Sequence, residues 1–158
     1  MNWPAAITAG IWGTVVMTLT MYYVPPVIGL PPMDIGTMLG TMFLPHDEAT
    51  ALGVGLGLHF VNGIIFVLAY AGVLLALRVQ STAWRGAVLG VILWLAGAML
   101  LLDPIMEMHP LVQSGEMTNP GYFMLNMGMG WKPAMFSLVT HLVYGLIAGF
   151  LYRHHART

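Results

Sequence analysis

The chain has 158 residues, of which 58% are hydrophobic and only 7% are charged, whereas a soluble domain carries about a quarter charged residues. Its formal net charge of -1 leaves no basic surface of the kind that nucleic acid requires, so we expect no nucleic-acid partner. Because the chain has no cysteine, only His, Met and carboxylate side chains remain as metal ligands.

Four apolar stretches are each long enough to cross a bilayer, which takes roughly 20 residues of helix. None of them contains Asp, Glu, Lys or Arg, and a backbone in lipid must be helical when it cannot close into a barrel. The sequence therefore predicts an all-α, integral membrane bundle of four transmembrane helices, in one domain that covers residues 1–158. The predicted spans are 5–23, 52–77, 86–102 and 134–152.

The connections between these spans carry signals of their own. After the first span, apolar residues recur at helical spacing over 35–43 and Asp34 is placed as an N-cap, which predicts a short helix lying in the membrane interface. Asp47 stands where the N-terminus of the second spanning helix favours negative charge. Ser81 or Thr82 is placed to cap the third span. We expect a less regular short helix in the second long connection.

Charge placement predicts the orientation of the chain. Four of the five basic residues lie between the second and third spans or after the fourth span, and basic loops favour the cytoplasm. The acidic residues fall in the two long connections, which we expect on the other side. We therefore expect a multi-pass protein of the bacterial inner membrane with both termini in the cytoplasm. The residues are Arg78, Arg85, Arg153 and Arg157, and Asp34, Asp47, Glu48, Asp103, Glu107 and Glu116.

An offset of 82 residues aligns the second half of the chain with the first. The shared pattern is H-x-V-x-G-x-I followed by Tyr, and it favours an internal duplication of one helical hairpin. Repeat 1 would cover about 1–77 and repeat 2 about 83–158. The two tandem hairpins would then be related by an axis along the membrane normal. The matched pairs are His59 with His141, Gly63 with Gly145, and Tyr70 with Tyr152.

His59 and His141 are the main chemical candidates within the spans, because an ionisable side chain inside a membrane is a functional candidate by default. The alignment predicts that both lie at the same depth, between the hairpins. One interpretation makes them axial ligands of haem b, with Gly63 and Gly145 leaving room for the porphyrin.

Three other interpretations of the two histidines remain open. The thioethers of Met17 and Met99, at similar depth on the other two helices, would complete a copper site. The pair could instead pass protons or ions. The structural alternative is that each imidazole donates a hydrogen bond to a neighbouring helix and specifies packing.

Nine of the fourteen methionines lie in the two long connections. Met106, Met108 and His109 form the densest ligand-like cluster, and periplasmic copper handling would use this composition. Methionine also fills irregular apolar interfaces and adapts to partner surfaces, which is the favoured alternative. The nine are Met33, Met38, Met42, Met106, Met108, Met117, Met124, Met127 and Met129.

Three segments, GIWGTVVMTL near the start, GLPPMDIGTMLG after the first span and HFVNGIIFVLAY in the second, carry a resemblance to a known group of proteins. They resemble a family of small bacterial four-helix integral membrane proteins classed as a domain of unknown function. The resemblance covers most of the chain and rests mainly on residues 29–40 and 59–70. It implies an inner-membrane protein and assigns no catalytic or cofactor residue.

The familiar nucleotide-binding and hydrolase motifs are missing from the sequence, so we assign no catalytic residue and expect no activity of its own. We expect a small inner-membrane accessory subunit or binding module with a Met-rich periplasmic face, associated with other membrane subunits or with itself. Two alternatives are haem b or copper binding in electron transfer or metal handling, and a small transporter or channel.

Overall fold

The computed structural model describes residues 1–155, the last three by their backbone alone. Within that range the chain is helical and has no strand. Four helical segments are long and apolar enough to cross a membrane. The predicted all-α class and its four candidate spans are thereby confirmed. They are α1 (Trp3–Tyr23), α3 (Glu48–Ala76), the segment Ala83–Glu107, which begins with α4 (Ala83–Ala96), and α7 (Lys132–His155).

Short helices fill the connections. The first long connection holds η1 (Pro25–Ile28) and α2 (Ile35–Thr41). The second holds α6 (Pro110–Gln113) and the irregular 3-10 turn η3 (Tyr122–Met127). The predicted cap at Asp34 is confirmed, and Thr82 rather than Ser81 caps the third span. Asp47, predicted only as a favourable charge, is an N-cap too, and these hydrogen bonds start the second and third spanning helices a few residues earlier than predicted. The caps are Asp34 for α2, Asp47 for α3 and Thr82 for α4.

The third spanning segment contains a π-helical turn that the sequence analysis did not predict. After α4, the chain forms η2 (Gly97–Leu101) and then α5 (Leu102–Glu107). Pro104 follows closely; its ring would crowd the carbonyl of Leu100 in a regular helix and it has no N–H to donate. A π-helical turn widens the backbone there, so the segment continues past the proline to Glu107.

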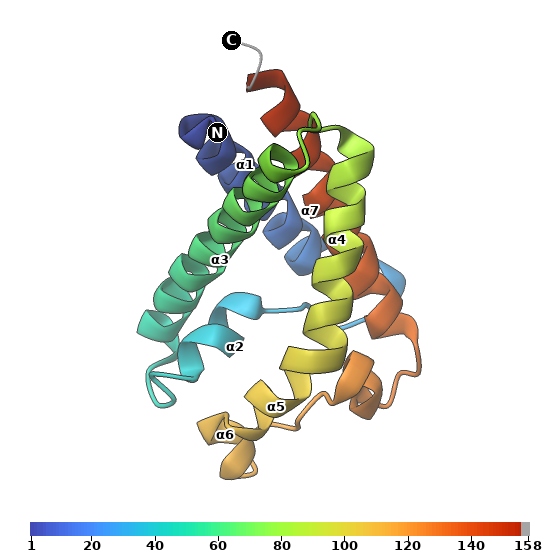
Figure 1. The fold of residues 1–158 in the computed structure, drawn as a ribbon. Coiled ribbons are helices and arrows are strands. Elements are labelled where there is room, and N and C mark those ends of the chain that lie inside the picture. The colour runs from blue at the N-terminus through green and yellow to red at the C-terminus, as the bar shows by residue number, and fades with distance from the viewer. Residues whose placement is uncertain (156–158) are drawn as a thin grey trace.

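Among the four long helices, α1 and α7 are the central pair. α7 packs against both α1 and α4, and α1 packs against α3. Figure 1 shows α3 and α4 diverging from the short loop that joins them. The N-terminus, the end of α7 and this loop lie at one end of the molecule, which we call the terminal end. α2, α5 and α6 lie at the opposite end, which we call the connection end (Figure 1).

Glycines allow the helices of each predicted hairpin to touch. A Cβ on Gly10 of α1 would lie 2.7 Å from the Ile64 Cα of α3, and a Cβ on Gly86 of α4 would lie 2.0 Å from the Gly145 carbonyl oxygen of α7. Such close approach is how helices associate in lipid. Under the offset of 82 residues Gly63 corresponds to Gly145, and each lies at the crossing of its own hairpin, whereas Gly86 corresponds to Pro4 rather than to Gly10. The duplication stays a prediction.

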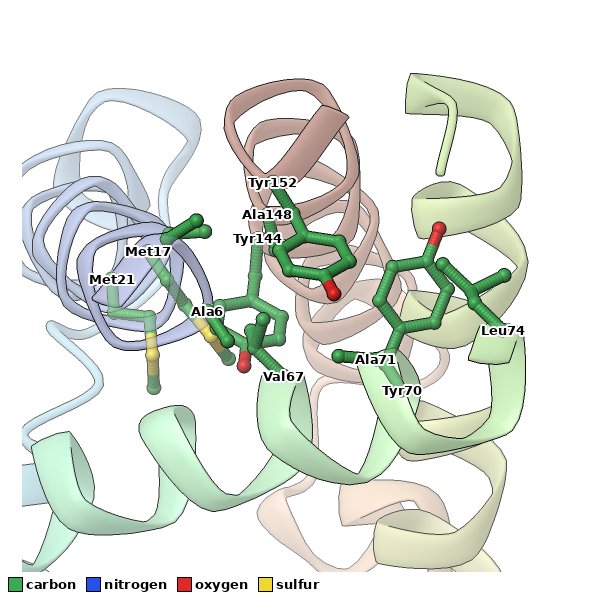
Figure 2. Packing of buried hydrophobic residues seen from close by; sticks show 12 residues of the cluster. Ala6, Met17, Met21, Val67, Tyr70, Ala71, Leu74, Tyr144, Ala148 and Tyr152 are labelled. Carbon is green, nitrogen blue, oxygen red and sulfur yellow. The ribbon is translucent and has the colours of Figure 1, made fainter. Parts of the chain in front are cut away.

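The buried apolar core lies between α1, α3 and α7. Figure 2 shows Tyr144 and Tyr152 of α7 reaching toward α3, with Met17 and Met21 of α1 beside them. The Tyr144 hydroxyl donates a hydrogen bond of 2.5 Å to the Gly63 carbonyl oxygen. These contacts join α3 to α7 beside α1, and Met21 extends the core to the connection end.

Candidate functional site

A partly open cavity of about 620 Å³ lies at the connection end of the molecule. Its volume falls within the range of small-molecule sites, about 300–1,000 Å³. Both long connections contribute to it, as do the end of α1 and the start of α5. Eight of the fourteen methionines line it, so one cavity gathers more than half of the methionines in the chain. They are Met21, Met33, Met38, Met106, Met117, Met124, Met127 and Met129.

The predicted set of connection methionines is therefore largely brought together. Seven of the nine line the cavity, and Met42 and Met108 do not. Met21 was assigned to the first span, and it joins them because α1 ends beside the cavity. The remaining lining is mostly apolar, with Asp34, Thr37, Thr118 and Asn126 as its polar side chains.

One wall of the cavity is α2, which is fixed tightly against α3. A Cβ on Gly40 would lie 1.7 Å from the Ala51 carbonyl oxygen, and a Cβ on Gly55 would lie 1.8 Å from the Gly36 carbonyl oxygen. These glycines bring the two backbones into direct contact, which holds the cavity wall in place. The helix predicted after the first span is thus confirmed, but its closest packing uses the glycine face and not the apolar face from which it was predicted.

The opposite wall is the segment 117–129. The Asn119 side chain donates to the Asp103 carboxylate of α5 over 3.0 Å and accepts from the Gly121 N–H over 2.9 Å. Further along, the Phe123 ring lies between Trp94 and Trp131, with ring centroids 5.4 Å and 5.7 Å away. The segment is therefore anchored to the third spanning segment and to the start of α7.

His109 joins α2 to the segment that follows α5. The side chain is fully buried at 0% exposure, and its Nδ1 accepts a hydrogen bond from the Leu111 N–H over 3.2 Å. Nδ1 therefore carries no proton, and Nε2–H donates to the Met38 carbonyl oxygen of α2 over 3.1 Å. The Thr41 hydroxyl lies 3.2 Å from the same nitrogen. His109 was predicted as a metal ligand, but here both of its nitrogens form hydrogen bonds within the protein.

Asp34 supplies the charge of the cavity. Its carboxylate accepts hydrogen bonds from the Tyr22 hydroxyl and, at 2.9 Å and 2.7 Å, from the N–H and hydroxyl of Thr37. Burial raises the pKa of the Asp34 carboxyl, but these hydrogen bonds outweigh burial and hold the pKa below its ordinary value. The carboxylate is therefore charged at neutral pH.

The two predicted histidines of the spans lie in a different place. His59 and His141, on α3 and α7, are near enough to interact electrostatically. His141 Nδ1 is 2.8 Å from the Ser137 carbonyl oxygen of its own helix, so this imidazole does not bond to a neighbouring helix through Nδ1. His59 Nε2 is buried and has no hydrogen-bond partner among the described residues. One nitrogen of the pair is therefore bonded within its own helix and another is buried without a partner, and a shared site for the two imidazoles stays a prediction.

The residues predicted to surround this pair are dispersed. The space beside Gly63 and Gly145 is taken by neighbouring helices, since a Cβ there would lie 1.9 Å from the Thr14 hydroxyl and 2.1 Å from the Gly86 carbonyl oxygen, respectively. These glycines serve helix contact and leave no room for a porphyrin at that point. Met99 is 50% exposed on the π-helical turn, whereas Met17 is buried in the core.

The predicted cluster of Met106, Met108 and His109 at the end of α5 is likewise divided between buried and exposed positions. Met106 is buried at 1% exposure and lines the cavity, whereas Met108 is 71% exposed. Among the side chains that the structure describes, those of residues 1–152, His, Asp and Glu do not gather in threes as a metal-binding group. The feature that sequence reasoning missed is the role of Asp34, which it identified only as a helix cap. Its place within a stretch rich in Met and Pro was the available signal.

Comparison with known proteins gives one match. The model of a family described as "Family of unknown function (DUF6789)" matches residues 2–158. No curated protein matches the chain, and no solved structure matches it.

Proposed function

The chain belongs to the DUF6789 family of unknown function, and we propose that it is a small membrane-embedded binding module that takes an apolar ligand into the methionine-lined cavity. The observation that carries this proposal is the gathering of eight methionines from both connections around one cavity of about 620 Å³. We assign no catalytic residue to the module, and in this proposal it works by binding alone.

The chemistry of methionine supports a binding role. The side chain is unbranched and its thioether is polarizable, so methionine-rich surfaces adapt their shape to apolar partners. Prolines and hydrogen bonds hold the backbone on both sides: Pro31, Pro32 and Pro120 line the cavity, and His109 donates a hydrogen bond to the backbone of α2. A fixed backbone with adaptable side chains suits a site that encloses an apolar ligand.

Methyl NMR of isotope-labelled methionine tests the proposal, because the protein supplies both the probes and the controls. The protein is titrated in neutral maltoside micelles with phenylbutanol, a soluble apolar probe. We expect the methyl signals of the eight lining methionines to shift. The six others should stay in place, and uniform shifts or none at all would contradict the proposal. Those six are Met1, Met17, Met42, Met99, Met108 and Met135.

A pair of substitutions in one segment provides the matched control. Met127→Trp places a large ring into the cavity wall and should weaken probe binding, whereas Leu125→Trp alters an exposed side chain that does not line the cavity and should leave binding unchanged. Equal effects of the two substitutions would place the probe elsewhere on the protein.

A second candidate function is a metal site at His59 and His141. The buried, unpartnered Nε2 of His59 supports it, because a buried polar atom without a partner is costly and marks a missing ligand. The filled space beside Gly63 and Gly145 favours a small ion over haem. Copper in elemental analysis of the purified protein, lost in both His59→Ala and His141→Ala, is the expected result. A metal-free preparation that also fails to take up added copper would contradict this candidate.

A further inference from the structure

Asp34 is the only ionisable side chain among the residues that line the cavity. The groups that donate hydrogen bonds to it, the Tyr22 hydroxyl and the N–H and hydroxyl of Thr37, are all neutral. Neutral donors orient a carboxylate without cancelling its charge. A net negative charge therefore stands at the wall of a cavity made mainly of thioethers and prolines, where low polarity strengthens its attraction for a cation.

We propose that the ligand joins an apolar body to a protonated amine, with the methionines around the body and Asp34 as the counter-ion of the amine. This inference rests on the binding function proposed above and names the class of ligand. A neutral ligand would separate the carboxylate from water and leave its charge without a counter-ion, which is costly. An anionic ligand would be repelled. The Asn126 side chain also lines the cavity and adds an acceptor for the ammonium group.

The position of Asp34 explains how the charge is kept in place when the cavity is empty. As the N-cap of α2 it is bonded to the first turn of a helix whose glycines press against α3. Its carboxylate is thus oriented before any ligand arrives, and binding does not have to order it. Pre-organised charge of this kind raises affinity for the complementary group.

Three probes of similar shape test the ligand class: phenylbutylamine, phenylbutanol and phenylbutyrate, added to the protein in neutral maltoside micelles. We expect the amine to bind about tenfold more tightly than the alcohol, as a charge-assisted hydrogen bond allows, and the acid to bind most weakly. Asp34→Asn should bring the amine to the level of the alcohol and leave the alcohol unchanged. Asparagine is also a good N-cap, so α2 keeps its start.

Asp47→Asn is the matched control, because Asp47 caps α3 in the same way, is exposed and does not line the cavity. It should leave all three affinities unchanged. Equal binding of amine and alcohol to the unaltered protein would overturn this inference, as would a preference for amine that survives Asp34→Asn. If none of the three probes binds the unaltered protein, the proposed function itself is wrong.

Two sources can supply such a ligand: a free amphiphilic amine, or a membrane lipid whose headgroup ends in an ammonium. Adding an ethanolamine phospholipid to the micelles, in parallel with an uncharged glycosyl diacylglycerol, separates them. Competition with phenylbutylamine by the ethanolamine lipid alone assigns the lipid as the source. If neither lipid competes, a free amine is the source.

Discussion

A buried imidazole with hydrogen bonds at both nitrogens acts as a rigid link between the segments that it joins. His109 is such a link, because Nε2–H donates to the backbone of α2 while Nδ1 accepts from the Leu111 N–H at the start of α6. Met38 and Met106 both line the cavity, and they lie on α2 and on α5, just before His109. The shape of the cavity should therefore depend on this one side chain.

The substitution His109→Ala tests the link. It removes the partner of the Leu111 N–H and the imidazole donor of the Met38 carbonyl oxygen and leaves a cavity in place of a fully buried ring, and we expect a loss of about 2–3 kcal/mol of stability. Phenylbutanol binding should weaken as the walls separate. Met108→Ala, next to it but exposed, should change stability by less than about 0.5 kcal/mol. Chemical unfolding in micelles measures both, and equal stabilities would contradict the role given to His109.

At the scale of the helices, the contact between α2 and α3 is made by glycine. Gly36 and Gly40 of α2 meet Ala51 and Gly55 of α3 with backbone against backbone, so any side-chain atom added at the crossing must push the helices apart. The position of α2, and with it one wall of the cavity, is set by this crossing.

Alanine substitutions along α3 test the crossing. Gly55→Ala should destabilise the protein by about 1–3 kcal/mol, the usual cost of overpacking, because its Cβ would meet the Gly36 carbonyl oxygen at 1.8 Å. Gly53→Ala, two residues earlier on the same helix, adds a Cβ with nothing within 4 Å. It should be neutral or stabilise the helix by up to about 1 kcal/mol. If the two variants unfold alike, α2 does not pack as described.

Elements with local signals were predicted well, and elements that depend on tertiary contact were not. Asp34, Asp47 and Thr82 start helices because a cap acts on the N–H groups two or three residues away, which sequence alone reveals. The packing face of α2 was missed, since hydrophobic periodicity gives no weight to glycine and the closest contact in this fold is a glycine contact. The π-helical turn before Pro104 was also missed.

In the candidate site, too, features with local signals were predicted and features that depend on tertiary contact were not. The number of methionines in the connections indicated a methionine-rich end, but which of them converge depends on how two distant segments fold together. Met108 is exposed while Met106, two residues earlier, is buried. The spacing of the two histidines predicted a shared region, and this stays a prediction. Whether the thioethers of Met17 and Met99 face the histidines depends on how each helix is rotated about its own axis. The apolar periodicity of a membrane helix specifies this rotation poorly.

At the scale of the whole molecule, charge is separated between the two ends. All six acidic residues lie in or beside the connections, whereas Arg78 and Arg85 lie by the loop between α3 and α4 at the terminal end (Figure 1). Of the two other basic residues used to predict the orientation, the side chain of Arg153 and all of Arg157 lie outside the described residues. We propose that the terminal end faces the cytoplasm, as basic loops do.

Because the chain contains no cysteine, single substitutions report this orientation directly. Gln80→Cys marks the terminal end and Ser114→Cys marks the connection end, and both positions are exposed. In intact bacterial cells, a membrane-impermeant maleimide should label Ser114→Cys alone, and both variants should react once the cells are opened. Labelling of Gln80→Cys in intact cells would reverse the orientation. Association with other subunits stays a prediction, because lipid would cover the exposed apolar helix faces equally well.

Mapping where an apolar probe binds tests the central claim most directly, namely that both connections together form one ligand site. A photoreactive analogue of phenylbutanol is crosslinked to the protein in micelles, with and without an excess of phenylbutanol, and the labelled residues are identified by mass spectrometry. The account predicts that the crosslinks lost on competition fall in both 31–38 and 117–129, the two segments that line the cavity. Competed crosslinks confined to the outer faces of α3 and α4 would contradict it.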